Sequence, residues 1–165
     1  MVGSAGMIAI AFDKEISTYL DPIMRPTTIR MKNHISSESA PAALGSYSQA
    51  IRNGDTLYTS GQIGLDPTKL TLVEGVESQI RQTFANIEAI CEAAGATLDN
   101  ISKLTVYLVA REDWTLVNQV MGEIFTKPFP ARTAVGVVWL PLGATVEIEA
   151  IVSLPGTKGE APERR

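Results

Sequence analysis

The stretch TVEIEAIVSL, residues 145–154, predicts a β-strand near the end of the chain. Its apolar side chains recur at every second position, as in a strand with one buried face: Val146, Ile148, Ala150 and Val152. Glu147 and Glu149 stand between them and point to the other face. The pattern alone favours a face in contact with solvent. The alternative is that a carboxylate is held there at a functional site.

A second apolar segment, residues 133–140, precedes this strand and is separated from it only by Pro141-Leu142-Gly143-Ala144. Because so short a connection suits a hairpin, we expect the two segments to pair. Arg132 would then lie across from the region beyond Glu147. An arginine at a strand end is usually a surface residue. As a site residue, its planar guanidinium can bind a carboxylate through two parallel hydrogen bonds, which a lysine cannot do.

Helix and strand patterns alternate upstream of these segments. Apolar residues between positions 77 and 94 recur on one helix face, and Gly95 is a natural C-terminal cap. Residues 104–110 predict a strand, and Asp113 can cap a second helix that stops at Lys127-Pro128. With an earlier strand at 57–60, the order is strand, helix, strand, helix, strand, strand.

The 165 residues, 45% of them hydrophobic, suffice for one buried core. We expect a globular domain over residues 35–155 and a polar tail over 156–165. Residues 1–34 lack a sustained helix or strand period and are expected to form an N-terminal extension. They fit neither a secretory signal nor a transit peptide. We therefore expect a cytoplasmic protein, with import into an organelle left open.

Composition disfavours several classes of function. The net charge is -4, with scattered basic residues, which argues against a dedicated nucleic-acid binder. His34 and Cys91 are the only residues of their types and cannot supply a usual zinc site. We expect Cys91 to lie in the core rather than to act as a nucleophile. Ser60 has no histidine partner within the domain, so a Ser-His hydrolase is also disfavoured.

Five segments in this order resemble one family, the reactive intermediate deaminase (Rid or YjgF) family, in its RidA-type branch. They are APAALGSYSQA at 40–50, LYTSGQI at 57–63, FPART at 129–133, Leu140-Pro141 and VEIEA at 146–150. The resemblance runs from about residue 35 to residue 154. It implies a chorismate-mutase-like α+β fold, a mixed sheet with two helices on one face, assembled as a homotrimer with active sites between subunits.

The same resemblance implies hydrolysis of 2-imino acids, released by pyridoxal-phosphate enzymes such as threonine dehydratase, to 2-keto acids and ammonia. It implies no cofactor and no metal. Arg132 would bind the substrate carboxylate, Glu147 would activate water and Tyr47 would close the pocket. The implied lining residues are Ser60, Gly61, Asn118 and, through its backbone, Ala134.

Two positions depart from the family pattern. Ser46 stands where the family often has proline, which removes a fixed φ next to Tyr47. Ala134 stands where many members have cysteine, so thiol chemistry is not expected. Two alternatives stay open: a non-catalytic or regulatory trimer that binds small carboxylates, and a ribonuclease or translation inhibitor. The latter is disfavoured because phosphate contacts require a basic surface.

Assembly is also indicated by the strand at 133–140. Residues 134–139 read AVGVVW and are apolar on both faces of the predicted strand. Two helices can cover only one face of a sheet. We therefore expect the other face to be buried in a cyclic oligomer.

Overall fold

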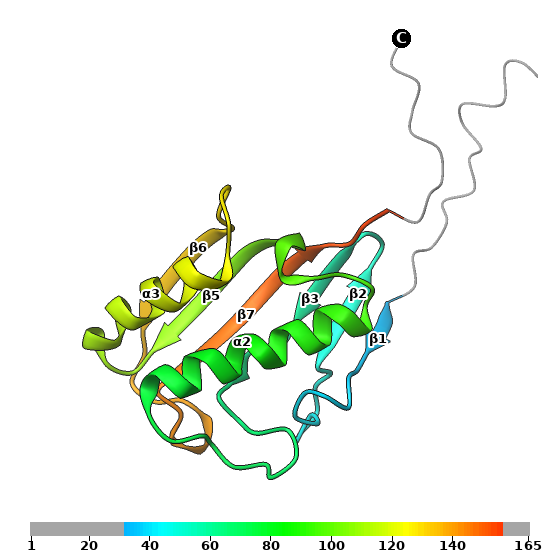
Figure 1. Cartoon of the computed structure of the whole chain (residues 1–165). Helices are drawn as coiled ribbons and strands as arrows, with labels where there is room; N and C mark the ends of the chain where they lie inside the picture. Colours follow the sequence, from blue (N-terminus) through cyan, green and yellow to red (C-terminus); the bar gives the residue numbers. More distant parts are fainter. Residues whose placement is uncertain (1–31, 157–165) are drawn as a thin grey trace, which may run out of the picture.

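The computed structural model describes residues 32–156, which form one mixed sheet with two helices packed on one face (Figure 1). The strand order is β1-β2-β3-β7-β5-β6, and the short β4 also pairs with β7. The strands are β1 Asn33–Ile35, β2 Ala50–Asn53, β3 Thr56–Thr59, β4 Gln62–Ile63, β5 Ile101–Leu108, β6 Ala131–Gly136 and β7 Val146–Ser153. The helices are α2 Val76–Ala93 and α3 Trp114–Ile124. The expected α+β class is confirmed.

Strand β7 lies in the middle of the sheet, between β3 and β5. Its even-numbered side chains are buried beneath α2, as their alternation predicts: Val146, Ile148, Ala150 and Val152. Ile80, Phe84 and Ile87 of α2 are buried on the facing side. Removing these apolar surfaces from water is the main favourable contribution to folding.

The C-terminus of α2 has the predicted glycine cap. Gly95 has φ +78°, its N–H donates to the Glu92 carbonyl at 2.9 Å, and the Ala96 N–H donates to the Cys91 carbonyl at 2.9 Å. These bonds satisfy carbonyls that the helix end leaves without partners. Cys91 itself is buried, and burial raises the pKa of its thiol to about 12. It packs as a core residue.

Helix α3 begins as predicted, just after Asp113, but this residue does not cap it with its side chain. The 3-10 turn Arg111–Asp113 runs directly into the helix, so Asp113 has helical φ and ψ angles. A capping side chain requires an extended backbone at that position.

The predicted hairpin between 133–140 and 145–154 is wrong. β6 pairs in parallel with β5, from Lys103↔Ala131 to Leu108↔Gly136, and β5 separates it from β7. The helix α3 connects β5 to β6, and a helical crossover places consecutive strands in parallel. β6 ends at Gly136. The connection that follows includes the 3-10 turn Pro141–Gly143 and passes the end of β5 to reach the start of β7.

The ends of the chain lie largely outside the described residues. The predicted extension at 1–34 is described only from Lys32, and Asn33 and His34 pair with β2. The predicted tail at 156–165 is described only at Gly156. Within the described part, no helix has the length and apolar character needed to cross a membrane.

Candidate active site

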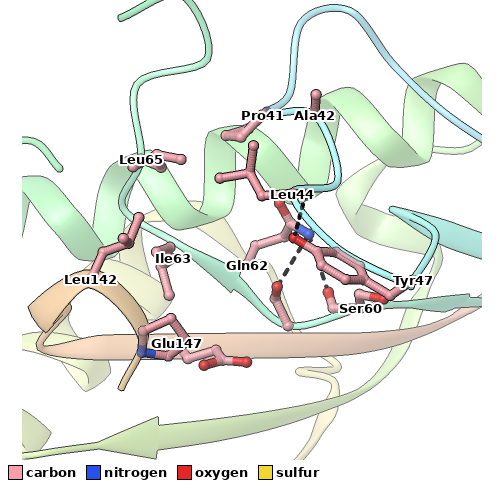
Figure 2. Close-up of a pocket in the computed structure, with 12 residues that line it drawn as sticks. Pro41, Ala42, Leu44, Tyr47, Ser60, Gln62, Ile63, Leu65, Leu142 and Glu147 are labelled. Atoms are coloured by element: carbon pink, nitrogen blue, oxygen red, sulfur yellow. Dashed lines mark hydrogen bonds between the residues drawn. The ribbon is translucent and has the colours of Figure 1, made fainter. Parts of the chain in front are cut away.

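A cleft of about 410 Å³ opens where β3 is followed by β4, beside the start of β7 (Figure 2). Ser60 and Gly61 separate these two strands and interrupt the pairing with β7. The hydroxyl of Thr59 accepts a hydrogen bond from the Ala150 N–H at 2.8 Å and replaces one missing backbone partner. The lining residues are Pro41, Ala42, Leu44, Tyr47, Ser60, Gly61, Gln62, Ile63, Leu65, Pro141, Leu142 and Glu147.

Glu147 forms one wall of this cleft (Figure 2). It is half-buried, on the sheet face opposite the helices, and no described basic side chain forms a salt bridge with it. Burial raises the pKa of its carboxyl above the usual range, and the negative charge of Glu149 raises it further. Glu149 accepts a hydrogen bond from the Tyr107 hydroxyl at 3.2 Å. A carboxylate with a raised pKa and no ion-pair partner is better suited to accept and return a proton than an ordinary surface carboxylate.

Gly61 makes this position of Glu147 possible. A Cβ atom at residue 61 would overlap the Glu147 carboxyl group. The carboxylate therefore lies directly against the backbone between β3 and β4. The family resemblance implies Gly61 as a lining residue, and the structure adds the reason why a residue without a side chain is needed at this position.

Tyr47 closes one side of the cleft from the loop before β2 (Figure 2). The Leu44 N–H donates to its phenolic oxygen at 3.2 Å, and the Tyr47 N–H donates to the Gly45 carbonyl at 2.9 Å. Ser60 joins the same loop, because its hydroxyl donates to the Ser48 carbonyl at 2.6 Å. These bonds hold the loop although Ser46 lacks the fixed φ of a proline.

Gln49 is a supporting residue to which the sequence analysis assigns no role. Its buried amide donates to the carbonyls of Pro41 at 2.8 Å and Ala40 at 3.2 Å, and its oxygen accepts from the Ser37 N–H at 2.6 Å. It thereby ties the segment that carries Pro41 and Leu44 to the sheet. A glutamine between Ser48 and Ala50, directly before β2, is the only signal in the sequence.

Arg132 lies elsewhere, on the helix face of β6. Its guanidinium stacks on Trp114, 4.4 Å from the ring centroid, and Nη1 lies 3.2 Å from the Met121 sulfur. Desolvation lowers the pKa of the guanidinium from its usual value. Among residues 32–156 no carboxylate lies within ion-pair distance of it. The arginine is therefore held in place while its charge stays available for an anion.

The predicted site residues thus fall into three groups. Tyr47, Ser60, Gly61 and Glu147 line the cleft between β3 and β4. Arg132 and Asn118 line a smaller cavity of about 220 Å³ beside α3. Ala134 of β6 lines a third cavity, of about 870 Å³, together with Arg111 and Trp114. Since Arg132 points to the helix face and Glu147 to the opposite face, the two cannot meet within one chain. The expected proximity, which relied on the hairpin, is wrong for the reason given above.

Comparison with known proteins identifies the family. The sequence model described as Endoribonuclease L-PSP matches residues 37–154, nearly the whole described part. The chain belongs to this L-PSP family. Solved structures similar to this chain include RidA from a Psychrobacter species, with a TM-score of 0.73 and 46% identity over 74% of this chain and 99% of that one. This similarity confirms the resemblance to the Rid or YjgF proteins. YjgF from E. coli gives a TM-score of 0.71 and 40% identity over 73% and 98%.

Curated relatives in the L-PSP family carry the name of an activity. The 2-iminobutanoate/2-iminopropanoate deaminase of Dermatophagoides farinae is 43% identical over 122 residues, which is 73% of this chain and 95% of the relative. The protein of the same name from Bos taurus is 47% identical over 118 residues, which is 71% and 86% of the two chains.

Gly61→Ala is expected to lower kcat for the reaction proposed below by about 100-fold, because the added methyl group displaces the Glu147 carboxylate and small misplacements of a reacting group are costly. Substrate affinity should change less. Steady-state kinetics measures both. Gly156→Ala after β7 is the control, since a Cβ atom there meets nothing within 4 Å and the residue lies outside the cleft. A fully active Gly61→Ala variant would contradict the role of this close contact.

Proposed function

We propose that this chain hydrolyses 2-imino acids such as 2-iminobutanoate and 2-iminopropanoate to 2-keto acids and ammonia, without a metal or cofactor. This assignment rests on the carboxylate of Glu147, which lines the cleft, is half-buried and has no ion-pair partner among the described residues. Burial raises its pKa above the usual range. The names of the deaminase relatives support the substrate class. A cytoplasmic location for the reaction is part of the proposal.

The chemistry requires little from the protein. The iminium carbon C2 is already electrophilic, so the main tasks are to orient the substrate and to deliver a water molecule. The water oxygen bonds to C2 while the water gives a proton to Glu147. Glu147 then returns that proton to the amine nitrogen, and the C–N bond breaks to release ammonia. The proton of the remaining hydroxyl passes to that ammonia as the keto group forms. The products are one 2-keto acid and one ammonium ion.

Arg132 would bind the substrate carboxylate with its two parallel N–H groups. Because Arg132 and Glu147 point to opposite faces of one sheet, we propose that the site is completed by a second copy of the chain, in a homotrimer. The sheet face without helices supports such an assembly. It exposes Tyr58 (48%), Val135 (41%) and Ile151 (37%), and apolar groups on an open sheet face favour burial against a partner.

The activity is tested by coupling the protein to threonine dehydratase and threonine, with semicarbazide to trap the free imine. We expect the protein to divert the imine to 2-ketobutanoate and to reduce semicarbazone formation. Dialysis against EDTA should leave the rate unchanged, because in the described part no three His, Cys, Asp or Glu side chains are grouped to hold a metal. An EDTA-treated protein that regains activity only with zinc would contradict metal independence.

The shared site is tested by mixing two variants of strongly reduced activity, Arg132→Ala and Glu147→Gln. In a trimer with sites between chains, random exchange of equal amounts should restore about a quarter of the sites, because each site needs one intact residue from each variant. Light scattering should give a mass near three times 17.7 kDa. An active monomer, or a mixture that stays inactive despite proven exchange, would overturn the shared site.

The family description also names an endoribonuclease. Within one chain, the lining of the cleft that holds Glu147 includes this carboxylate and no lysine or arginine. The second copy proposed above would add Arg132. One cation beside a carboxylate is far from the basic surface that contacts with several phosphates require, so this composition disfavours RNA as the ligand of the cleft.

A further inference from the structure

Two buried amide side chains on α2 bind the segments that hold Glu147. Gln79 and Asn86 are about two helical turns apart and lie on the same side of α2, among its buried apolar residues. Neither residue lines the cleft. Burial of an amide costs free energy unless its polar atoms are hydrogen-bonded. The partners of these two side chains therefore indicate what they do.

Asn86 binds β4 and the turn that follows it. The residue is fully buried, and its Nδ2 donates to the carbonyls of Ile63 and Leu65, both at 3.0 Å. Its Oδ1 accepts from the Gln82 side chain at 2.9 Å, which fixes the orientation of the amide. Ile63 pairs directly with Glu147 across the two strands (Figure 2). Asn86 thus holds the strand beside the carboxylate.

Gln79 binds the segment that leads into β7. Its Oε1 accepts from the N–H and the hydroxyl of Thr145, both at 3.0 Å, and its Nε2 donates to the Val73 carbonyl at 3.2 Å. Thr145 stands directly before β7 and two residues before Glu147. Gly64, after β4, lies against the same helix residue, because a Cβ atom there would be 2.5 Å from the Gln79 Cα.

Strand β4 needs this support from the helix. It has two residues and pairs with β7, so its own backbone bonds are few. Gly61 directly precedes it, and the Glu147 carboxyl lies where a side chain of Gly61 would be. A shift of β4 away from α2 would therefore move one wall of the carboxylate and admit water to it.

We propose that Gln79 and Asn86 are positioning residues for the deaminase reaction. They hold the start of β7 and strand β4 so that the Glu147 carboxylate stays against Gly61, partly shielded from water. The inference rests on the activity proposed above and adds the residues that keep its acid–base group in place.

Asn86→Ala tests the support of β4, because it removes both bonds to the carbonyls of Ile63 and Leu65. In steady-state assays with the imine from threonine, we expect kcat to fall by about tenfold to 100-fold, since small misplacements of a reacting group are costly. KM should change much less, because the side chain does not reach the cleft.

The pH profile of this variant is a second readout. A carboxylate that gains contact with water loses part of the burial that raises its pKa, so the acidic limb of kcat/KM should move to lower pH than in the parent. The ionisable groups around Glu147 are Glu149, Tyr107 and Tyr47, with Arg132 of the proposed second copy. The substitution leaves all four in place.

Gln79 offers a rescue by a conservative variant. Gln79→Met keeps the length of the side chain and removes its polar atoms, so kcat should fall by about tenfold. Gln79→Glu keeps an oxygen that accepts from Thr145 and loses only the bond to the Val73 carbonyl. It should keep nearly the kcat of the parent. If Asn86→Ala does not fold, this pair of variants decides the proposal.

Ile90→Ala is the matched control for loss of stability. Ile90 is fully buried on the same helix, and its truncation lowers Tm without removing a hydrogen bond to β4 or Thr145. Measured below its Tm, it should keep the kcat and the pH profile of the parent.

The positioning role is wrong if the folded Asn86→Ala and Gln79→Met variants keep either the kcat or the acidic limb of the parent. It is also wrong if Ile90→Ala changes both to the same extent, because the amides would then act only through stability. In either case the deaminase activity stands. If the parent protein hydrolyses no imine, the proposed function itself fails.

Discussion

Arg132→Ala is expected to lower kcat/KM for 2-imino acids by about 30-fold to several thousand-fold. The range corresponds to about 2–5 kcal/mol, the usual cost of removing one partner of a desolvated charge pair. So large an effect requires a guanidinium that is partly removed from water and not already paired with a carboxylate, and Arg132 meets both requirements. Desolvation already lowers the pKa of this guanidinium, and its described neighbours are an aromatic ring and a thioether rather than a carboxylate. Steady-state kinetics with the imines from threonine and alanine measures the loss.

Lysine at position 132 should restore only part of the activity, because an ammonium group cannot form two parallel hydrogen bonds with a carboxylate. Arg81→Ala is the control for loss of a positive charge. Arg81 is exposed on α2, where it pairs with Glu77 and Glu123, both at 2.7 Å. It should keep full activity. Near-normal turnover by Arg132→Ala would exclude carboxylate binding by Arg132.

Glu147→Gln is expected to lower kcat by about 100- to 10,000-fold, the usual contribution of a positioned acid–base group, with a much smaller change in substrate affinity. Glutamine keeps the shape of the side chain and removes its proton-accepting oxygen. Single-turnover and steady-state measurements separate the two effects. If Glu147→Gln and Glu149→Gln both had small and equal effects, the interpretation of this face of β7 as a solvent-exposed surface without a catalytic role would be favoured instead.

Glu149→Gln should retain most of the activity and shift its pH dependence. The charge of Glu149 helps to raise the pKa of Glu147, so its removal lowers that pKa. Because Glu147 acts as a base only when ionised, the acidic limb of the profile of kcat/KM against pH should move to lower pH. A limb that stays in place would show that another group controls it.

Folding stability gives an independent check on Glu147. Its raised pKa in the folded chain means that ionisation opposes folding, so its contribution to stability falls as the pH rises from the ordinary glutamate pKa through the raised one. Glu147→Gln should therefore be at least as stable as the parent at neutral pH. The difference should vanish below about pH 4, where the carboxyl is protonated in both states. Loss of activity with retained or higher Tm then assigns the effect to chemistry rather than to unfolding.

Local sequence patterns predict α2 and β7 well, because the apolar face of the helix and the alternation of the strand each depend only on residues of that element. The helix face over residues 77–94 and the glycine after it correspond to Val76–Ala93 and its cap. The alternation at 145–154 correctly assigns which residues of β7 are buried. The strands β1, β2 and β4 were not predicted, because three segments of two to four residues carry too little periodicity to be recognised.

The sequence by itself determined the family, through motifs spread over residues 40–150, and it identified Tyr47, Ser60, Gly61 and Glu147, which share one cleft. Only the tertiary structure decided that β5 lies between β6 and β7, and so that Arg132 and Glu147 point to opposite faces. The physical reason is that side-chain alternation specifies the two faces of a strand, whereas the choice of neighbouring strand depends on contacts between residues far apart in the chain.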